Sequence, residues 1–201
     1  MVFPKEEYFD LAGFEHRAIF EGTRHVWEVL PKIASYVAKQ VGDEKVVIGE
    51  GTVIEEGALI KGPAIIGKNC VIGHGAYIRE NVIIADNVTI GHASELKNSI
   101  VLPHTAVAHF NYIGDSVVGS HVNIGAGAKT ANFRLDGKHV RVKVDEDAVD
   151  TGLAKFGAII GDNCKIGINS VLNPGTMLGK GCLVYPLVSV IGAYGKDAII
   201  R

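Results

Sequence analysis

The sequence contains few aromatic residues, which make up 7% of its 201 positions and include a single tryptophan. A core with so few rings must be filled mainly by aliphatic side chains. No apolar run approaches the ~18 residues that a membrane span needs, and the first ten residues lack the basic start and apolar stretch of a signal peptide. We therefore expect a cytoplasmic protein with no membrane partner.

Neither sign of charge is in large excess. The 20 Lys and Arg residues face 22 Asp and Glu residues, which gives a formal net charge of −2. This balance excludes the broad basic surface of a general nucleic-acid binder, so any anion site must be local.

Cysteine is also scarce. Cys70, Cys164 and Cys182 are odd in number and widely spaced, which predicts neither a disulfide framework nor a zinc cluster. We expect each of them to be a small buried apolar group, and we expect no metal site.

Glycine, by contrast, is abundant, and it accompanies a six-residue repeat. The 25 glycines are roughly 12% of the chain, against a usual ~7%. Branched aliphatic residues recur at every sixth position in two series, namely Ile48, Ile54, Ile60, Ile66, Ile72, Ile78, Ile84, Ile90, Leu96 and Leu102, and later Ile160, Ile166, Leu172, Leu178, Val184 and Val190. A period of six is not helical, because one face of a helix returns every three or four residues. Hexapeptide repeats predict a parallel β-helix. Three hexads form one coil of this fold, so each coil contains about 18 residues.

The first 42 residues differ from the repeat. They contain Trp27 and apolar residues at helical spacing, which predicts two helices joined near Gly22 and Thr23, with Pro31 starting or kinking part of the second. We therefore expect an N-terminal α-helical cap over 1–42 and an all-β solenoid over 43–201. Because a solenoid end exposes unpaired core, the cap is expected to cover the first coil or a neighbouring subunit.

Two interruptions of the repeat mark candidate sites, because functional sites are where regular patterns fail. At the first, Ala108 stands where an aliphatic residue is due, and the spacing from Ala108 to Ile113 shortens to five. The second is an insertion at about 125–156, which we expect to project as a loop or short hairpin and to carry binding function.

Histidines gather in the repeat region. His74 and His92 are 18 residues apart, or one coil, and are expected to stack as exposed turn residues. His109 directly follows the first interruption, and we expect it to be functional. An imidazole titrates near neutral pH, which suits it to general-base chemistry.

The segments around these interruptions resemble those of a known family in order and in most spacings. They are Glu95-Leu96-Lys97, Ala108–Asp115 (AHFNYIGD), Val122–Gly127 (VNIGAG), Asn132-Phe133 and Lys155–Asp162 (KFGAIIGD). The family is the acetyltransferase half of the bifunctional glucosamine-1-phosphate acetyltransferases and N-acetylglucosamine-1-phosphate uridylyltransferases, in particular their archaeal-type relatives. The resemblance implies a left-handed β-helix and acetyl transfer from acetyl-CoA to the amino group of an amino-sugar 1-phosphate.

The resemblance also implies roles for individual residues. His109 would be the general base, and Glu95 would orient it. Ala126 and Gly127 would contact the acetyl-CoA cosubstrate, and backbone N–H groups of their turn would stabilise the oxyanion. Basic, hydroxyl and amide side chains would bind the sugar phosphate: Arg79, Lys97, Lys155, Tyr112, Asn123 and Asn132.

Two observations bear on the cations of this set. Arg79 and Lys97 are 18 residues apart, so they should stack on one face of the solenoid whether or not the resemblance holds. In the insertion, Lys138 competes with Lys155 for the role of loop cation, because the choice depends on where a gap is placed.

Three functions stay open at this point. The first is an N-acetyltransferase that acts as a homotrimer with sites between subunits, and without uridylyl transfer, because the sequence has no glycine-rich nucleotidyltransferase loop. The second is a metalloenzyme like the γ-class carbonic anhydrases, since His104 and His109 are five residues apart. The third is a β-helical scaffold without catalysis, which the joint presence of His109, Glu95 and Arg79 disfavours.

Overall fold

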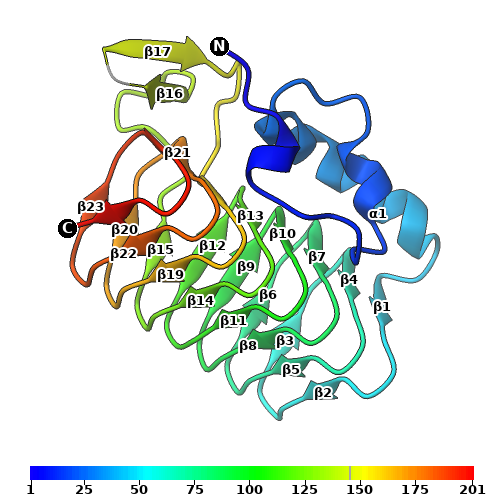
Figure 1. Ribbon diagram of the computed structural model, residues 1–201. Coiled ribbons are helices and arrows are strands. Elements are labelled where there is room, and N and C mark those ends of the chain that lie inside the picture. Colours follow the sequence, from blue (N-terminus) through cyan, green and yellow to red (C-terminus); the bar gives the residue numbers. More distant parts are fainter. Residues whose placement is uncertain (145) are drawn as a thin grey trace.

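The computed structural model describes residues 1–144 and 146–201. From residue 46 the chain winds as a parallel β-solenoid (Figure 1), and each coil adds one short strand in turn to three sheets, here named A, B and C. The prediction of an all-β, left-handed parallel β-helix built from hexapeptide repeats is confirmed.

The strands of each sheet pair in parallel with those one coil away. Sheet A consists of β1 (Val46–Ile48), β4 (Ala64–Ile66), β7 (Val82–Ile84), β10 (Ser99–Val101), β13 (Val117–Val118), β18 (Ala158–Ile160), β21 (Thr176–Leu178) and β24 (Ala193–Tyr194). Sheet B consists of β2 (Val53–Ile54), β5 (Val71–Ile72), β8 (Thr89–Ile90), β11 (Ala106–Val107), β14 (Asn123–Ile124), β19 (Lys165–Ile166), β22 (Leu183–Val184) and β25 (Ile199–Ile200). Sheet C consists of β3 (Leu59–Ile60), β6 (Tyr77–Ile78), β9 (Glu95–Lys97), β12 (Tyr112–Gly114), β15 (Lys129–Thr130), β20 (Val171–Leu172) and β23 (Ser189–Val190).

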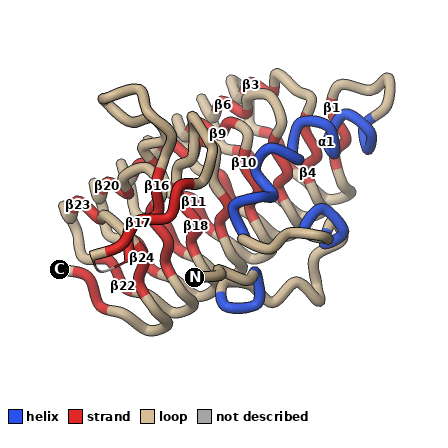
Figure 2. Tube along the Cα trace, turned by 90° about the horizontal axis from the view of Figure 1, so that it is seen from above, coloured by secondary structure: helices blue, strands red, loops and turns tan. Residues whose placement is uncertain are grey.

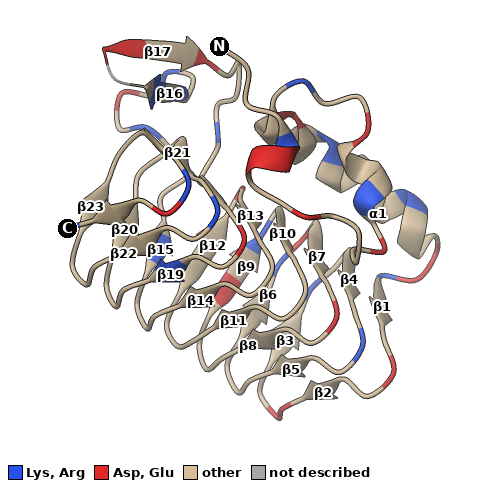
Figure 3. Ribbon diagram, viewed as in Figure 1, with Lys and Arg blue, Asp and Glu red and all other residues tan. Residues whose placement is uncertain are grey.

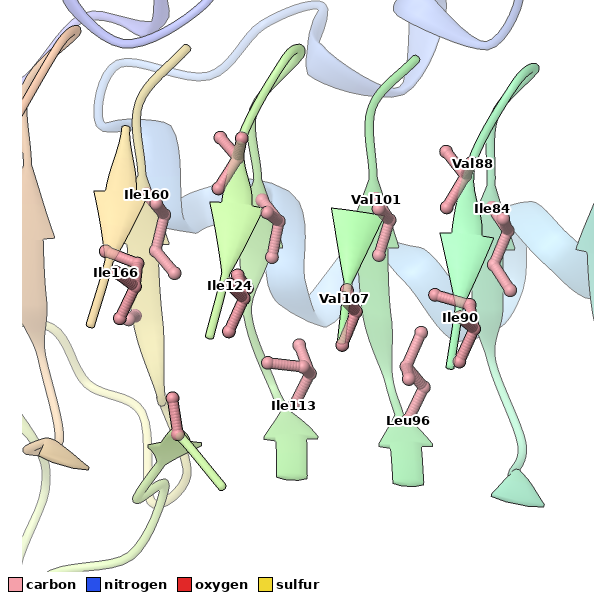
Figure 4. Close-up of a cluster of buried hydrophobic side chains, with 14 of the residues drawn as sticks. Ile84, Val88, Ile90, Leu96, Val101, Val107, Ile113, Ile124, Ile160 and Ile166 are labelled. Atoms are coloured by element: carbon pink, nitrogen blue, oxygen red, sulfur yellow. The ribbon is translucent and has the colours of Figure 1, made fainter. Parts of the chain in front are cut away.

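The last residue of most strands points into the solenoid. Figure 4 shows these side chains stacked in columns, for example Ile84 beside Val101 in sheet A and Ile90 beside Val107 in sheet B. The three cysteines are fully buried in the same cluster, as expected. Burial of this aliphatic column is the main source of stability, at about 1.5–3 kcal/mol for each fully buried side chain.

Coil length changes at one corner only, the C-to-A corner, where the chain passes from sheet C to sheet A. Inward residues on either side of the other two corners are always six apart. At the C-to-A corner, Leu96 and Val101 are five apart, and so are Ile113 and Val118, in the registers of sheets C and A. The insertion leaves the solenoid at this corner as well.

The shortened corners correct the expected register. Val101 and Val107 point inward where the six-residue series places Leu102 and Ala108. The first short corner turns at Asn98 (φ 44°), one residue sooner after its inward residue than the full-length corner of the preceding coil, which turns at Asn81 (φ 62°). The first interruption of the repeat is therefore after Leu96, not at Ala108.

The N-terminal segment lies along the outer face of sheet A and not over the end of the solenoid (Figure 2). Instead of two helices it forms three 3-10 helices and one α-helix, and Pro31 lies inside the third: η1 (Lys5–Glu7), η2 (Arg17–Phe20), η3 (Val26–Lys32) and α1 (Ile33–Val41). Outward residues of sheet A such as Ile83 and Ile100 are buried in one hydrophobic cluster with Trp27 of this segment. At the uncovered end, Ile48 and Ile54 are 46% and 38% exposed.

The insertion begins later than expected. Strand β15 still belongs to sheet C, and the chain leaves the solenoid between β15 and β18. It forms an antiparallel hairpin of β16 (Arg141–Val144) and β17 (Asp147–Asp150), whose basic and acidic strands stand out in Figure 3. Val140 and Val142 pack into the cluster that covers sheet A. Among the described residues, no helix is both long and apolar enough to cross a bilayer.

A candidate active site on sheet C

A pocket of about 310 Å³ lies on the outer face of sheet C, beside the C-to-A corner. Its lining combines two stacked cations of adjacent coils, a tyrosine and three residues of the insertion: Arg79, Lys97, Tyr112, Asn132, Phe133 and Lys155. Five of these six are residues that the resemblance assigns to the sugar phosphate. The stacking of Arg79 and Lys97 that their 18-residue spacing predicts is present, because β6 and β9 pair in register.

Arg79 is held by the neighbouring coil. Its Nη1 donates a hydrogen bond to Glu95 Oε1 over 2.9 Å, and this bond raises the pKa of the guanidinium further. Its Nε is buried without a hydrogen-bond acceptor in the described part of the chain, since Glu80 Oε2 is 3.7 Å away. Glu80 therefore faces this N–H at ion-pair distance and does not form a hydrogen bond with it.

Lys97 is held by the carboxylate of Asp115, a residue to which the sequence analysis assigned no role. Lys97 Nζ lies 3.1 Å from Asp115 Oδ2, and the Asp115 side chain is 6% exposed. Asn98 Nδ2 also donates to Asp115 Oδ1, over 2.9 Å. The signal that could have found Asp115 is its corner, where the two preceding coils place asparagine in the same left-handed conformation, at Asn81 and Asn98.

Tyr112 and Asn132 join the solenoid to the insertion. Asn132 Nδ2 donates to Tyr112 Oη over 3.1 Å and also to Asp115 Oδ2. Burial raises the pKa of the Tyr112 phenol, and the Asp115 carboxylate adds to the rise. The phenol therefore keeps its proton and can donate it to a ligand.

Of the two candidate loop cations, Lys155 lines the pocket on sheet C. Lys138 lines a different pocket, of about 560 Å³, with Arg134 and Arg141 of the insertion. The geometry favours Lys155 as the loop cation of the sheet C pocket.

His109 lies at the B-to-C corner, three residues before Tyr112, and its side chain is exposed. Its Nδ1 is close to the backbone of the preceding coil, since a Cβ atom on Gly91 would lie 3.1 Å from it. Glu95, expected to orient His109, is paired with Arg79 instead, and within the described residues no side chain makes a hydrogen bond to the imidazole.

The turn after β14 stacks directly on His109. Gly127 N–H donates to the His109 carbonyl over 2.8 Å and to Asn111 Oδ1 over 3.1 Å, and Gly125 N–H donates to the Ile166 carbonyl. Considering residues 1–144 and 146–201, this leaves the N–H of Ala126 as the one donor of the turn without an acceptor.

Asn123 is not brought to the pocket. It is an exposed residue at the start of β14, on the outer face of sheet B. His104 and His109 also lie apart, because His104 occupies the A-to-B corner, where its ring stacks on His121 at 4.8 Å. No group of three or more His, Cys, Asp or Glu residues in the described ranges is placed to hold a metal ion.

A further pocket of about 290 Å³ lies between the N-terminal segment and the solenoid. It is lined by His16, Lys68 and Asp86 among others, and by none of the candidate catalytic or binding residues. The sheet C pocket therefore stands as the candidate site because of its residues, not its size.

Comparison with known proteins places this geometry in a family. The family model "GMPPB C-terminal domain" matches residues 60–152, and the model "Bacterial transferase hexapeptide (six repeats)" matches residues 157–192. An uncharacterized acetyltransferase, YaiX of Escherichia coli O6:K15:H31, is 37% identical over 159 residues, which are 79% of this chain and 69% of the relative. The chain belongs to the hexapeptide-repeat acyltransferases.

The bifunctional protein GlmU of Methanococcus maripaludis (strain C7) is 46% identical to this hexapeptide acyltransferase over 187 residues, 87% of this chain and 45% of the relative. The resemblance seen in the sequence is thereby confirmed, and the chain spans less than half the length of that relative. Among solved structures, the N-acyltransferase AntD of Bacillus cereus, in complex with dTDP and coenzyme A, matches with a TM-score of 0.46 and 20% identity over 80% of each chain.

Proposed function

We propose that this acyltransferase transfers the acetyl group of acetyl-CoA to the 2-amino group of an amino-sugar 1-phosphate of the glucosamine 1-phosphate type. The observation that carries the proposal is the lining of the sheet C pocket, where three cationic side chains meet a phenol and a carboxamide. A sugar phosphate needs both kinds of group, because its phosphate is a dianion and its ring carries hydroxyl groups.

The cations would bind the phosphate. Arg79 contributes a charge that its hydrogen bond to Glu95 fixes in place. Lys97 and Lys155 approach from the next coil and from the insertion. Tyr112 supplies a hydroxyl donor that keeps its proton, and Asn132 supplies an amide for the sugar ring.

His109 would act as the general base. The amine attacks the thioester carbonyl carbon, a C–N bond forms, and the C–S bond to coenzyme A breaks. The proton that the nitrogen loses goes to the His109 imidazole, and the resulting imidazolium gives it to the thiolate leaving group. The free N–H of Ala126, one coil beyond His109, is the candidate donor to the oxyanion.

The cosubstrate would lie along the B-to-C corner. Beyond His109 and Ala126 this corner continues with Ile168, which is 51% exposed, and Leu187, which is 75% exposed. An apolar strip of this kind suits the pantetheine arm of acetyl-CoA and leads it to the base, while Gly127 leaves room for close approach.

We further propose a homotrimer with the site shared between subunits. Asn123 is expected to contact the acceptor, yet it lies on sheet B, away from the sheet C pocket. A site that contains all the assigned residues therefore has to be completed by Asn123 of a neighbouring copy.

The test is a thiol-release assay with acetyl-CoA and a panel of amino-sugar phosphates, including the unphosphorylated sugar. We expect release with an amino-sugar 1-phosphate and a much higher KM without the phosphate. Replacing His109 by Ala should lower kcat by ~10²- to 10⁴-fold with little change in acceptor affinity, as for loss of a general base. His74→Ala, at the same corner two coils earlier, is the matched control. No release with any amino sugar would refute the proposed function, and a fully active His109→Ala variant would refute the role of His109.

A further inference from the structure

The sheet C pocket has a buried carboxylate behind it that the proposed chemistry does not use. Asp115 follows β12 at the C-to-A corner, and its side chain is 6% exposed. Three side chains donate to it: Lys97, Asn98 and Asn132. A buried charge is costly unless it is satisfied in this way.

The corner itself does not require a carboxylate. Asp115 has a left-handed backbone (φ 48°), and so do Asn98 (φ 44°) and Asn81 (φ 62°) at the same corner of the two preceding coils. Asparagine serves this conformation as well as aspartate does. The charge at position 115 therefore needs another reason than the turn.

That reason is found in the donors. An ionised carboxylate only accepts hydrogen bonds, whereas an asparagine side chain would present an NH₂ group to other donors. Lys97 Nζ lies 3.1 and 3.4 Å from the two carboxylate oxygens, and Asn98 donates to Oδ1. Both carboxylate oxygens of Asp115 therefore face NH groups, which donate hydrogen bonds and cannot accept them.

The orientation of the Asn132 carboxamide follows from this. Because Asp115 accepts only, the NH₂ group of Asn132 must face it, and the same NH₂ also donates to Tyr112 Oη over 3.1 Å. The carbonyl oxygen of Asn132 is then the atom left for the pocket, and no donor of the described residues reaches it.

We propose that Asp115 is a positioning residue that determines the specificity of the pocket. It fixes the Asn132 carboxamide with its oxygen toward the ligand and holds the Lys97 ammonium beside it. The pocket thereby offers an acceptor to a hydroxyl or ammonium group and cationic donors to a phosphate. The inference rests on the proposed function for the identity of the ligand, but the orientation of Asn132 exists without a ligand.

The first test measures that orientation in the free protein. The side-chain amide protons of Asn132 are assigned by ¹⁵N NMR through their loss in Asn132→Ala. In the wild type we expect at least one of these amide protons to exchange slowly with water. In Asp115→Asn we expect its exchange rate to be higher by tenfold or more. Asp197→Asn, the same substitution in another left-handed corner residue far from the pocket, should leave the exchange unchanged. Equal exchange rates in wild type and Asp115→Asn would overturn the proposal.

The second test is a double-mutant cycle in steady-state kinetics. Asp115→Asn should lower kcat/KM for the amino-sugar phosphate by ~10- to 100-fold, the range for a lost charge-assisted hydrogen bond. In an Asn132→Ala background the same change should cost much less, because the two residues act together. Additive effects, with thermal unfolding unchanged, would show that Asp115 does not act through Asn132. A wild-type enzyme without activity would instead refute the proposed function, and the exchange measurement would still decide the role of Asp115.

Discussion

The guanidinium of Arg79 is paired across one coil with the carboxylate of Glu95, at 2.9 Å from Nη1 to Oε1. The resemblance implies that Glu95 orients His109, but in the free protein this pairing makes Glu95 hold the Arg79 guanidinium in place. The two roles differ in which kinetic constant they affect.

If Glu95 acts through Arg79, Glu95→Gln should raise the KM for the sugar phosphate and leave kcat nearly unchanged. The effect should stay below about fivefold, because both side chains are about one-third exposed and such pairs contribute about 1 kcal/mol or less. Initial rates over a range of acceptor concentrations measure both constants. Arg79→Ala, which removes the cation itself, should raise KM more than Glu95→Gln does. If the kcat of Glu95→Gln instead fell by about a hundredfold or more at unchanged KM, the result would support the role of Glu95 in orienting His109.

Substitutions of the two lysines of the insertion, Lys155 and Lys138, should have clearly different effects on the KM for the sugar phosphate. Lys155→Ala should raise the KM for the sugar phosphate by ~10- to 100-fold, because it removes a charged donor from the sheet C pocket. Lys138→Ala, which keeps the pocket intact, serves as the control and should change KM by less than about twofold. Titration calorimetry with the sugar phosphate gives the same comparison without turnover. The opposite ranking would mean that the loop moves Lys138 into the site when substrate binds.

Gly91 lies next to His109 in the preceding coil, so a substitution there tests the proposed role of His109 as general base without removing the imidazole. A Cβ at position 91 would collide with the Ala108 carbonyl and lie 3.1 Å from His109 Nδ1. Gly91→Ala should therefore displace the corner and lower kcat by about tenfold or more, since misplacement by about 1 Å can cost ~10²-fold.

The control for this change is Gly73→Ala, at the same corner one coil earlier, where the nearest atoms are 3.1–3.2 Å away. Its kcat should remain within about twofold of wild type, and both variants should be checked by thermal unfolding. Equal kcat values in the two variants, with both folded, would place the reacting atoms away from His109.

The repeat alone predicts most of the fold. Six-residue spacing requires short strands and tight turns, and the inward positions follow correctly from Ile60 to Leu96. The prediction fails at the next corner, because that corner is one residue shorter and hydrophobic periodicity does not record turn conformation. Leu102 remains a buried aliphatic residue in either register, so its burial could not reveal the shift.

The site was predicted in part. Coil spacing alone placed Arg79 beside Lys97, and the resemblance added Tyr112, Asn132 and Lys155, all of which line one pocket. The role of Asp115 could not be foreseen, because it depends on contact between a corner of one coil and a segment that enters from the insertion. The position of the N-terminal segment could not be predicted either. The strands of sheet A are apolar on both faces, and the sequence does not show which of their residues face the core and which are covered by that segment.

The confinement of length changes to the C-to-A corner has a consequence for protein engineering. Two of the three corners have constant spacing, so any residue added there would shift the following strands out of register with their neighbours. The C-to-A corner already accommodates turns of different length and a whole hairpin. A designer who wishes to graft a recognition loop onto this scaffold should choose that corner in a coil remote from the pocket.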